Sequence, residues 1–589
     1  MSDTRLGLAL SGGGFRAAFF HLGVLAHMAE LDLLRHVESI STVSGGSIIG
    51  ALYYIHLKNL LETFEDNQIT RDHYIALVKK VEQAFSAATK RNLRMCTFAS
   101  VRHNMKMASS RYSRSDRIGE LYDEYIFRPA WSKNENDPPR STPIMMHELK
   151  IHPADDKHEG DFNPTHGHNE HRKNKVPVLN INASVLNTGH DWRFTASDMG
   201  EVVHKEPLDV DIDKNTRLLK GRYKEICLRQ QGFLLGKAVA ASACVPGIFP
   251  PLSISDMYDM NVQLVDGGVY DNQGIEALLN GGIECTHMII SDASGQMRDN
   301  KNPETGTLAI FSRTTDMLMG RVREEMIGQA CDKQGENNVA IMHMTQGLPV
   351  MFMRHRGADC KPLTDQRTQV GDPIPEYDQD MRGRLARVRT DLDSFHDVEA
   401  KSIMTLGYTL ATAKLDKLLH QLSMVKKPHD TVGWSFLNVA EWLRDTSSAP
   451  DNFSKQLDVA EQKFGKWFRL GITPPMLLAL FIFVLGIGIY GSLIVTVIEW
   501  VNPGSFMQVY DWLAMTSLLD GVTALAVLLL LKLLDMFGSV FKAVSIVRKP
   551  YQYLLTLFAR IILPALCAIP VRLYLLTLDR YYVNQGKLE

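Results

Sequence analysis

A chain of 589 residues is too long for a single hydrophobic core, so two or three domains are expected. The formal net charge is only −2, which gives no global attraction to nucleic acid. The seven cysteines are scattered without a Cys-x-x-Cys pair, which argues against a zinc site and against a disulfide framework.

The first informative run is a glycine triplet near the N-terminus. Residues 6–10 predict a short buried strand and residues 15–34 predict a helix. The turn between them holds the glycines 12–14, which leave backbone N–H groups unpaired at the start of a helix. Such a turn binds a phosphate or a developing oxyanion. The third glycine of a dinucleotide fingerprint and the Lys of a phosphate loop are missing, which favours an oxyanion hole, with a plain tight turn as the alternative.

Ser44 lies at a second predicted strand-to-helix corner. Residues 37–43 predict a strand with β-branched side chains, and a helix is expected to follow. A serine at such a corner is placed like the nucleophile of a nucleophile elbow, where the small neighbours Gly45 and Gly46 leave room. The usual pattern is Gly-x-Ser-x-Gly, and Thr42 stands here in place of the first glycine. The alternative is that Ser44 only caps the following helix.

Asp266 follows a further predicted strand, residues 262–265, and precedes Gly267 and Gly268. A carboxylate at the end of a strand in an α/β sheet lies at the edge where ligands bind. Alone, the run is better explained as a turn, but together with the elbow it predicts a base. A desolvated carboxylate with a raised pKa can take the proton of a serine hydroxyl, so no histidine is required. The three runs together predict serine-based acyl transfer.

These runs resemble the motifs of the patatin-like phospholipase family. The resemblance is carried by residues 11–16, 42–47 and 266–272, and by residues 241–251, which are similar to the stretch that precedes the last motif. Residues 389–395 and 406–408 resemble a closing segment of bacterial members. The resemblance therefore covers residues 5–300 and is extended to about residue 415.

The resemblance implies a three-layer α/β/α fold and a Ser–Asp dyad, with Ser44 as the nucleophile and Asp266 as the base. The backbone N–H groups of Gly12, Gly13 and Gly14 would form the oxyanion hole. Supporting positions in the same motifs are Arg16, Gly46, Gly267 and Gly268. The resemblance implies neither a metal nor a cofactor.

The expected catalytic domain spans residues 1–415 and carries a helical, His-rich insertion at about 65–175. The irregular spacing of the histidines favours a solvated surface loop over a metal site; they are His152, His158, His166, His168 and His171. Residues 354–380 predict a polar loop near the substrate edge, for which a lid is the functional interpretation.

The C-terminal part changes character after an amphipathic connector at 416–470. Residues 471–589 are the expected membrane-anchoring region. Within it, residues 476–498 carry no charge and residues 513–531 carry only Asp520, so each predicts a transmembrane helix.

The charges around this pair predict its orientation. Lys and Arg flank it on the outer sides, whereas residues 499–511 have none, so the positive-inside rule predicts that both ends lie in the cytoplasm. Residues 551–578 are interrupted by Pro and Arg and predict a basic interfacial segment.

The sequence therefore predicts a multi-pass protein of the cell (inner) membrane whose cytoplasmic domain is a serine acyl hydrolase of the phospholipase A or lysophospholipase type. Its expected partners are membrane phospholipids or other acyl lipids and no nucleic acid; self-association through the membrane helices is left open. Two alternatives remain. One is a thioesterase or transacylase on the same fold, and the other is a catalytically inactive membrane scaffold.

Overall fold

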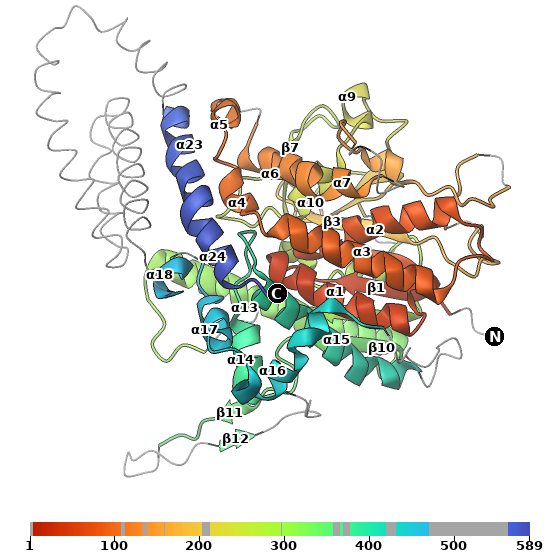
Figure 1. Cartoon of the computed structure of the whole chain (residues 1–589). Coiled ribbons are helices and arrows are strands. Elements are labelled where there is room, and N and C mark those ends of the chain that lie inside the picture. The colour runs from red at the N-terminus through yellow and green to blue at the C-terminus, as the bar shows by residue number, and fades with distance from the viewer. Residues whose placement is uncertain are drawn as a thin grey trace, which may run out of the picture.

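Figure 1 shows the computed structural model of the chain. The structure describes residues 4–107, 112–132, 138, 140–157, 160–165, 167–202, 212–295, 297, 299–356, 366–368, 377–419, 432–463, 465–470 and 563–588.

A mixed β-sheet forms the centre of the molecule. Its strand order is β10-β9-β1-β2-β3-β4-β5-β6, and β8 joins β3 and pairs with β7. The run from β10 to β3 is parallel, whereas β4 to β6 continue it antiparallel. The bounds are β1 (Leu6–Leu10), β2 (Val37–Val43), β3 (Val178–Val185), β4 (Asp191–Phe194), β5 (Asp198–Glu201), β6 (Gly221–Arg222), β7 (Leu252–Ile254), β8 (Val262–Asp266), β9 (His287–Asp292) and β10 (Val339–His343).

The central strands bury both of their faces. Along β1, Leu8 and Leu10 belong to the larger hydrophobic core, whereas Ala9 belongs to a smaller core on the opposite face. This alternation follows from the two-residue period of a strand, and it explains why the run has no polar residue.

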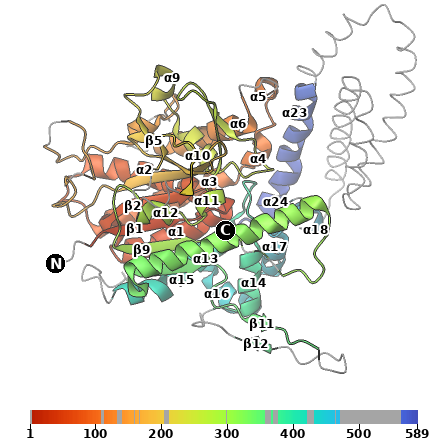
Figure 2. The same cartoon turned by 180° about the vertical axis from the view of Figure 1, so that it is seen from behind.

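Helices cover both faces of the sheet. One face carries α1 (Gly14–Glu30), α2 (Gly45–Thr63), α3 (Arg71–Thr89) and α15 (Asp397–Leu419), as Figure 1 shows. The view from behind in Figure 2 shows α13 (Thr307–Gln334) across the other face, which α12 (Glu276–Leu279) also covers. The fold is thus an α/β fold, as predicted, and its central sheet is mixed.

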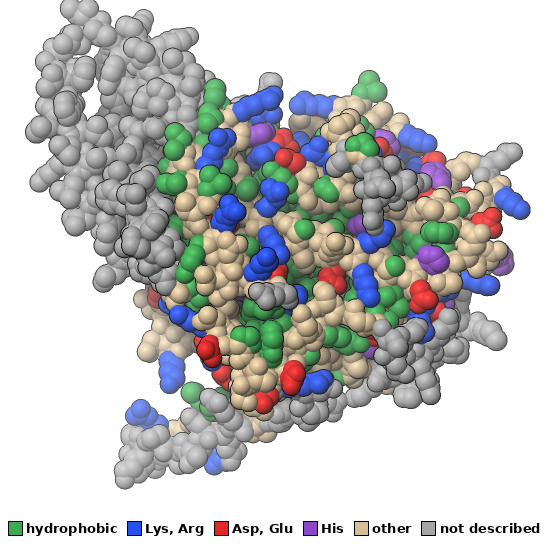
Figure 3. Space-filling model, in the orientation of Figure 1, with side chains coloured by type: hydrophobic (Ala, Val, Ile, Leu, Met, Phe, Trp, Pro, Cys, Tyr) green, Lys and Arg blue, Asp and Glu red, His purple; other side chains and the backbone are tan. Residues whose placement is uncertain are grey.

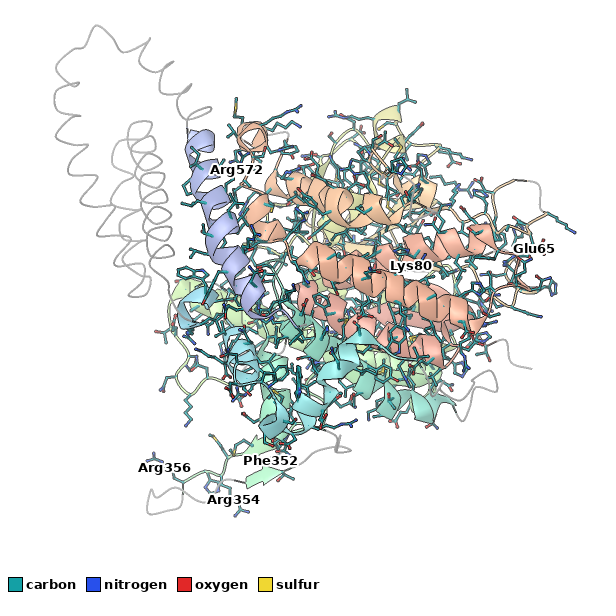
Figure 4. The ribbon with its side chains drawn as sticks, in the orientation of Figure 1. Glu65, Lys80, Phe352, Arg354, Arg356 and Arg572 are labelled. Atoms are coloured by element: carbon teal, nitrogen blue, oxygen red, sulfur yellow. The ribbon has the colours of Figure 1, made fainter. Side chains whose placement is uncertain are left out.

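The remaining helices lie in the insertion, around the site and near the C-terminus. Their bounds are α4 (Leu93–Cys96), α5 (Val101–Met107), α6 (Arg114–Tyr122), α7 (Arg128–Ala130), α9 (Leu228–Gln231), α10 (Leu235–Ser242), α11 (Gly268–Asp271), α14 (Gln379–Arg387), α16 (Ala440–Arg444), α17 (Phe453–Val459), α18 (Lys466–Leu470), α23 (Leu563–Tyr574) and α24 (Arg580–Gln585). A short hairpin, β11 (Val350–Phe352) with β12 (Gln366–Thr368), carries the Phe352 labelled in Figure 4.

The C-terminal residues return to the α/β domain. The Arg572 side chain on α23, labelled in Figure 4, donates from Nε to the Ala99 carbonyl at 2.6 Å. The Asp579 carboxylate is buried and accepts from Asn92 Nδ2 at 2.9 Å. Residues 563–588 therefore pack against the domain, and they include part of the stretch 551–578 for which the sequence predicts a basic interfacial segment.

The two predicted transmembrane helices, 476–498 and 513–531, lie outside the described residues. Among the helices that the structure does describe, none combines the length and the apolar character needed to cross a bilayer.

Candidate active site

Strand register brings the ends of β2 and β8 together. On β3, both β2 and β4 pair with Asn182, and both β4 and β8 pair with Ala183. Because a strand has only two edges, β2 and β8 must share one edge of β3 and meet end to end. Val43 is the partner of Asn182 and Asp266 is the partner of Ala183. Ser44, the residue after Val43, therefore lies next to Asp266.

Ser44 has the backbone conformation of an elbow. Its φ is 50° and its ψ is −115°, values that a residue with a side chain rarely adopts. It is the residue before the first turn of α2, but its side chain makes no capping hydrogen bond, so the cap alternative does not account for it. A side chain at Gly45 would overlap the Gly14 backbone, and one at Gly46 would overlap the Leu10 carbonyl. These contacts explain both glycines and join the elbow to the glycine loop.

The hydroxyl groups of Ser242, Ser47 and Thr42 support the elbow through a chain of hydrogen bonds. The Ser44 N–H donates to Ser242 Oγ at 2.9 Å, and Ser47 Oγ lies 2.8 Å from the same oxygen. Ser47 Oγ also donates to Thr42 Oγ1 at 3.0 Å, and Thr42 Oγ1 donates to the Asn180 carbonyl at 3.0 Å. Thr42, which departs from the usual elbow pattern, is thus part of the support of the turn. Sequence reasoning gave Ser242 no role, although it lies in the run that resembles the family.

The Asp266 carboxyl has the pKa that a base at neutral pH requires. It is buried, and burial raises its pKa to about 6. Hydrogen bonds from the Gly268 N–H, at 2.7 Å to Oδ1, and from the Ser44 side chain act in the opposite direction. The pair thus combines a serine hydroxyl with a carboxylate that is ionised above about pH 6 and accepts a proton readily.

Asn272 fills the space between the glycine loop and the Asp266 turn. A side chain at Gly268 would lie 2.5 Å from Asn272 Oδ1, and one at Gly12 would overlap the same atom. Gly267 packs against the Asn182 carbonyl, where a side chain would also overlap. Sequence reasoning did not single out Asn272, because its role depends on a contact across 260 residues of chain.

One of the three predicted oxyanion donors is occupied. The Gly12 N–H donates to the Asn272 carbonyl at 3.0 Å, so it is not free to bind an oxyanion in this structure. Gly13 and Gly14 have φ values of 137° and 60°; Gly13 is the residue before α1 and Gly14 is the first residue of that helix. Among the described residues, their N–H groups have no hydrogen-bond partner. The candidate oxyanion hole is therefore Gly13 and Gly14.

Arg16 and His21 are buried supports of the glycine loop. Arg16 donates from Nη2 to the Ala293 carbonyl and from Nη1 to the Val388 carbonyl, both at 2.8 Å. His21 Nε2 donates to the Ser11 carbonyl at 2.9 Å, and burial lowers the pKa of its imidazole to about 4. His21 is therefore neutral at pH 7 and supports the loop through its hydrogen bond to Ser11.

Apolar side chains are exposed beside Asp266. Val245, Ile248 and Val269 are 39%, 42% and 45% exposed. The Asp266 N–H donates to the carbonyl of Cys244, the neighbour of Val245, and Val269 follows Gly268. The rim of the site thus offers hydrophobic surface to a ligand.

The His-rich part of the insertion is only partly described, since His158 and His166 fall outside the described residues. His168 Nδ1 accepts from the Asn163 N–H at 3.2 Å. Among the residues that the structure covers, no group of three or more His, Cys, Asp or Glu side chains is arranged to hold a metal ion.

The comparison with protein families gives a match in the N-terminal half of the chain. Residues 8–279 match the family model described as patatin-like phospholipase. The chain carries a patatin-like phospholipase domain. The matched residues include the glycine loop, Ser44 and Asp266.

The solved structures to which the chain is similar are distant from it. Human GIVD cytosolic phospholipase A2, in complex with methyl gamma-linolenyl fluorophosphonate and terbium chloride, is 12% identical, with a TM-score of 0.33 over 72% of this chain and 60% of that one. A second structure of the human enzyme gives a TM-score of 0.31 at the same identity and coverage. VipD from Legionella pneumophila is 12% identical, with a TM-score of 0.24 over 98% of this chain and 91% of that one. The chain thus spans about 60% of the human enzyme. No curated protein matches the sequence.

Proposed function

We propose that this protein is a serine hydrolase that cleaves carboxylic esters of membrane lipids through Ser44 and Asp266. The observation that carries the proposal is the end-to-end meeting of β2 and β8, which sets a strained serine beside a buried carboxyl. The family match supports lipid esters as the substrate class. The apolar rim at Val245, Ile248 and Val269 suits an acyl chain.

The first half of the reaction forms an acyl-enzyme. Ser44 Oγ attacks the ester carbonyl carbon while its proton passes to the Asp266 carboxylate. The negative charge on the carbonyl oxygen is stabilised by the N–H groups of Gly13 and Gly14, each worth roughly 3 kcal/mol in the transition state. Asp266 then returns the proton to the leaving alkoxide oxygen as the carbon–oxygen bond breaks. The lipid alcohol leaves, and the acyl group stays on Ser44.

Water completes the cycle. Asp266 takes a proton from a water molecule whose oxygen attacks the acyl carbon, and the same two N–H groups hold the second oxyanion. Collapse of this intermediate breaks the bond to Ser44 Oγ, which regains its proton from Asp266. A fatty acid is released and the dyad returns to its starting state.

A substrate panel tests the proposal. Phospholipid, lysophospholipid, neutral lipid and acyl-CoA are offered to the full chain, and fatty acid release is measured. We expect lipid esters to be cleaved, and Ser44→Ala and Asp266→Asn to lose activity to the same extent, because the two groups act as a unit. Preference for acyl-CoA, or transfer to an alcohol, would favour the thioesterase or transacylase alternative. If none of these substrates were cleaved, the catalytically inactive scaffold would be the remaining alternative.

We also propose that residues 476–498 and 513–531 anchor the protein in the cell membrane with the catalytic domain in the cytoplasm. Their sequences and the distribution of Lys and Arg around them support this. Exposed Ile569 and Leu576 lie along the surface of α23 and its continuation, where Figure 3 shows hydrophobic side chains beside basic ones.

Extraction with carbonate and the reactivity of Ser505→Cys and Val540→Cys test the topology. Retention in the membrane is expected, with the cysteine at 505 accessible only from outside the cytoplasm and the one at 540 only from within it. Release by carbonate would contradict the anchor.

A further inference from the structure

The segment around Asp391 packs directly on the candidate oxyanion hole. The Asp391 carbonyl accepts from the Phe15 N–H at 3.0 Å, which uses the N–H that follows the two free donors. A side chain at Gly14 would lie 2.6 Å from the Asp391 carbonyl oxygen and 2.8 Å from its nitrogen. The position of the Asp391 backbone therefore fixes the left-handed turn at Gly14, and with it the direction of the Gly14 N–H.

A buried ion cluster holds this segment in place, and Arg389 is its centre. Arg389 Nε donates to both carboxylate oxygens of Asp393, at 2.7 and 3.0 Å, and Nη1 pairs with the Glu399 carboxylate. Nη2 donates to the Ser394 carbonyl at 2.8 Å and Nη1 to the Ala460 carbonyl at 2.9 Å. Arg389 thus donates from all three of its side-chain nitrogens, and a planar five-donor group is the side chain that can bridge so many acceptors.

Both chain segments that flank residues 471–562 contact this cluster through hydrogen bonds. On the N-terminal side, Lys466 Nζ donates to Asp393 Oδ2 at 2.6 Å. On the C-terminal side, Tyr582 Oη donates to Glu399 Oε1 at 2.6 Å, and Ser394 Oγ donates to Asp579 Oδ1 at 2.7 Å. The helices α18 and α24, which carry Lys466 and Tyr582, contact each other and lie together in Figure 1.

The charges of the four ion-paired side chains balance only when the segment that carries Lys466 is seated, whereas the C-terminal segment contributes the Tyr582 hydrogen bond to Glu399. Arg389 and Lys466 face Asp393 and Glu399, and all four side chains are at most 3% exposed. Withdrawal of Lys466 would leave a buried excess of negative charge, which a protein interior does not tolerate without rearrangement. The segment from 389 to 395 would then shift, and the backbone next to Gly14 is part of it.

We propose that Arg389 is a positioning residue of the active site, and that through it the two segments flanking residues 471–562 hold the Gly14 N–H in its catalytic direction. The proposal rests on the hydrolase function proposed above. The seating of α18 and α24 is coupled to catalysis because both helices contact the cluster and Asp391 contacts the glycine loop.

The test compares two neighbouring tyrosines in the full chain. Tyr582→Phe removes only the hydroxyl that binds Glu399, and Tyr581→Phe is the matched control, since Tyr581 is only partly buried and no described hydrogen bond involves its hydroxyl. Lys466→Met probes the other flank. Each variant is assayed on a small soluble ester, which needs no access to a bilayer, at a temperature where thermal unfolding shows that it is folded.

We expect kcat to fall roughly tenfold in Tyr582→Phe and Lys466→Met with KM changed less than twofold, because a displaced N–H weakens binding of the oxyanion and not of the ester. The rate of labelling by a fluorophosphonate should fall in parallel. The pH at which the hydrolysis rate is half of its maximum should stay at the wild-type value. Unchanged kcat, or a rise in KM alone, would overturn the proposal. An inactive wild-type protein would instead refute the hydrolase function, so the two failures are distinguishable.

Discussion

Burial raises the pKa of the Asp266 carboxyl to about 6, and the proposed mechanism uses the ionised form. Above about pH 6 the Asp266 carboxylate is ionised and can accept the Ser44 proton. Below about pH 6 the carboxyl is already protonated and cannot accept it. We therefore expect kcat/KM on a soluble ester to be level at neutral pH and to fall about tenfold per pH unit below about 6. A rate profile between pH 4.5 and 8.5 measures this.

A second carboxyl provides the control for that profile. Burial also raises the pKa of Asp271 to about 6, but its oxygens accept from the N–H groups of Gln273, Gly274 and Glu276 and so serve the turn. The Asp271→Asn variant should keep the acid limb of the rate profile, which is the fall in kcat/KM below about pH 6. If the limb disappeared in Asp271→Asn, the assignment of the base to Asp266 would be wrong.

At single residues, the sequence indicates which residues belong to the candidate site, but it does not indicate which of their N–H groups are already hydrogen-bonded. Ser44 and Asp266 are recognisable because each follows a strand and precedes glycine, and both signals are local. Gly12 looks like its two neighbours in the sequence, yet its N–H is bonded to Asn272. That difference depends on a contact between distant parts of the chain, and no local pattern contains it.

At the scale of elements, the packing of β2 against α2 explains how Thr42 is tolerated in the elbow. A Cβ at Gly50 would lie 2.6 Å from Thr42 Cγ2, so the glycine in the helix makes room for the methyl group in the strand. We expect Gly50→Ala to lower the free energy of unfolding by about 1–2 kcal/mol, because overpacking outweighs the gain in helix propensity.

Thr42→Ser tests this pairing, because it removes the methyl group and keeps the hydroxyl that Ser47 and Asn180 use. In the Thr42→Ser background, Gly50→Ala should cost nothing or stabilise. Gly328→Ala is the control in a helix, since among the described residues no atom beyond its own helix backbone and chain neighbours lies within 4 Å of the added carbon. Equal destabilisation by Gly50→Ala in both backgrounds would show that Thr42 is not the neighbour that matters. Denaturant unfolding monitored by circular dichroism gives the values.

The strands of the site were predicted within a residue, whereas their arrangement was not. The apolar runs at 6–10 and 37–43 became β1 and β2 with the same bounds, and the run at 262–265 became β8 with Asp266 as its last residue. Strand periodicity is a local property. The register that brings β8 to the edge of β3 is set by pairing between residues about 80 apart in the chain, which a single sequence does not reveal.

At the scale of the whole molecule, the structure describes the chain up to Leu470 and again from Leu563 to residue 588. Residues 563–588 then pack on the domain. The boundary near residue 415 follows the extent of the family resemblance. It separates Arg389 from Lys466 and Tyr582, which bind the two carboxylates that Arg389 pairs with. Local sequence patterns do not predict that residues 563–588 pack on the domain, since this packing depends on contacts between distant parts of the chain.

This return changes what a soluble form of the protein must contain. A chain truncated near residue 464 loses Lys466 and Tyr582, and we expect it to lose most of its activity on a soluble ester. A chain in which a flexible linker replaces residues 471–562 keeps both and should retain that activity while carbonate releases it from membranes. Rates and sedimentation of the two forms give the comparison. Equal activity of both would contradict the role of the flanking segments.

The central claim is that Ser44 is a nucleophile activated by Asp266, and covalent labelling tests it most directly. The full-length protein is treated with a fluorophosphonate, digested, and analysed by mass spectrometry to find the modified residue. We predict a single adduct on Ser44 that forms rapidly at pH 8, forms much more slowly at pH 5, and is absent from both Ser44→Ala and Asp266→Asn. An adduct on another serine, or undiminished labelling of Ser44 in Asp266→Asn, would contradict the dyad.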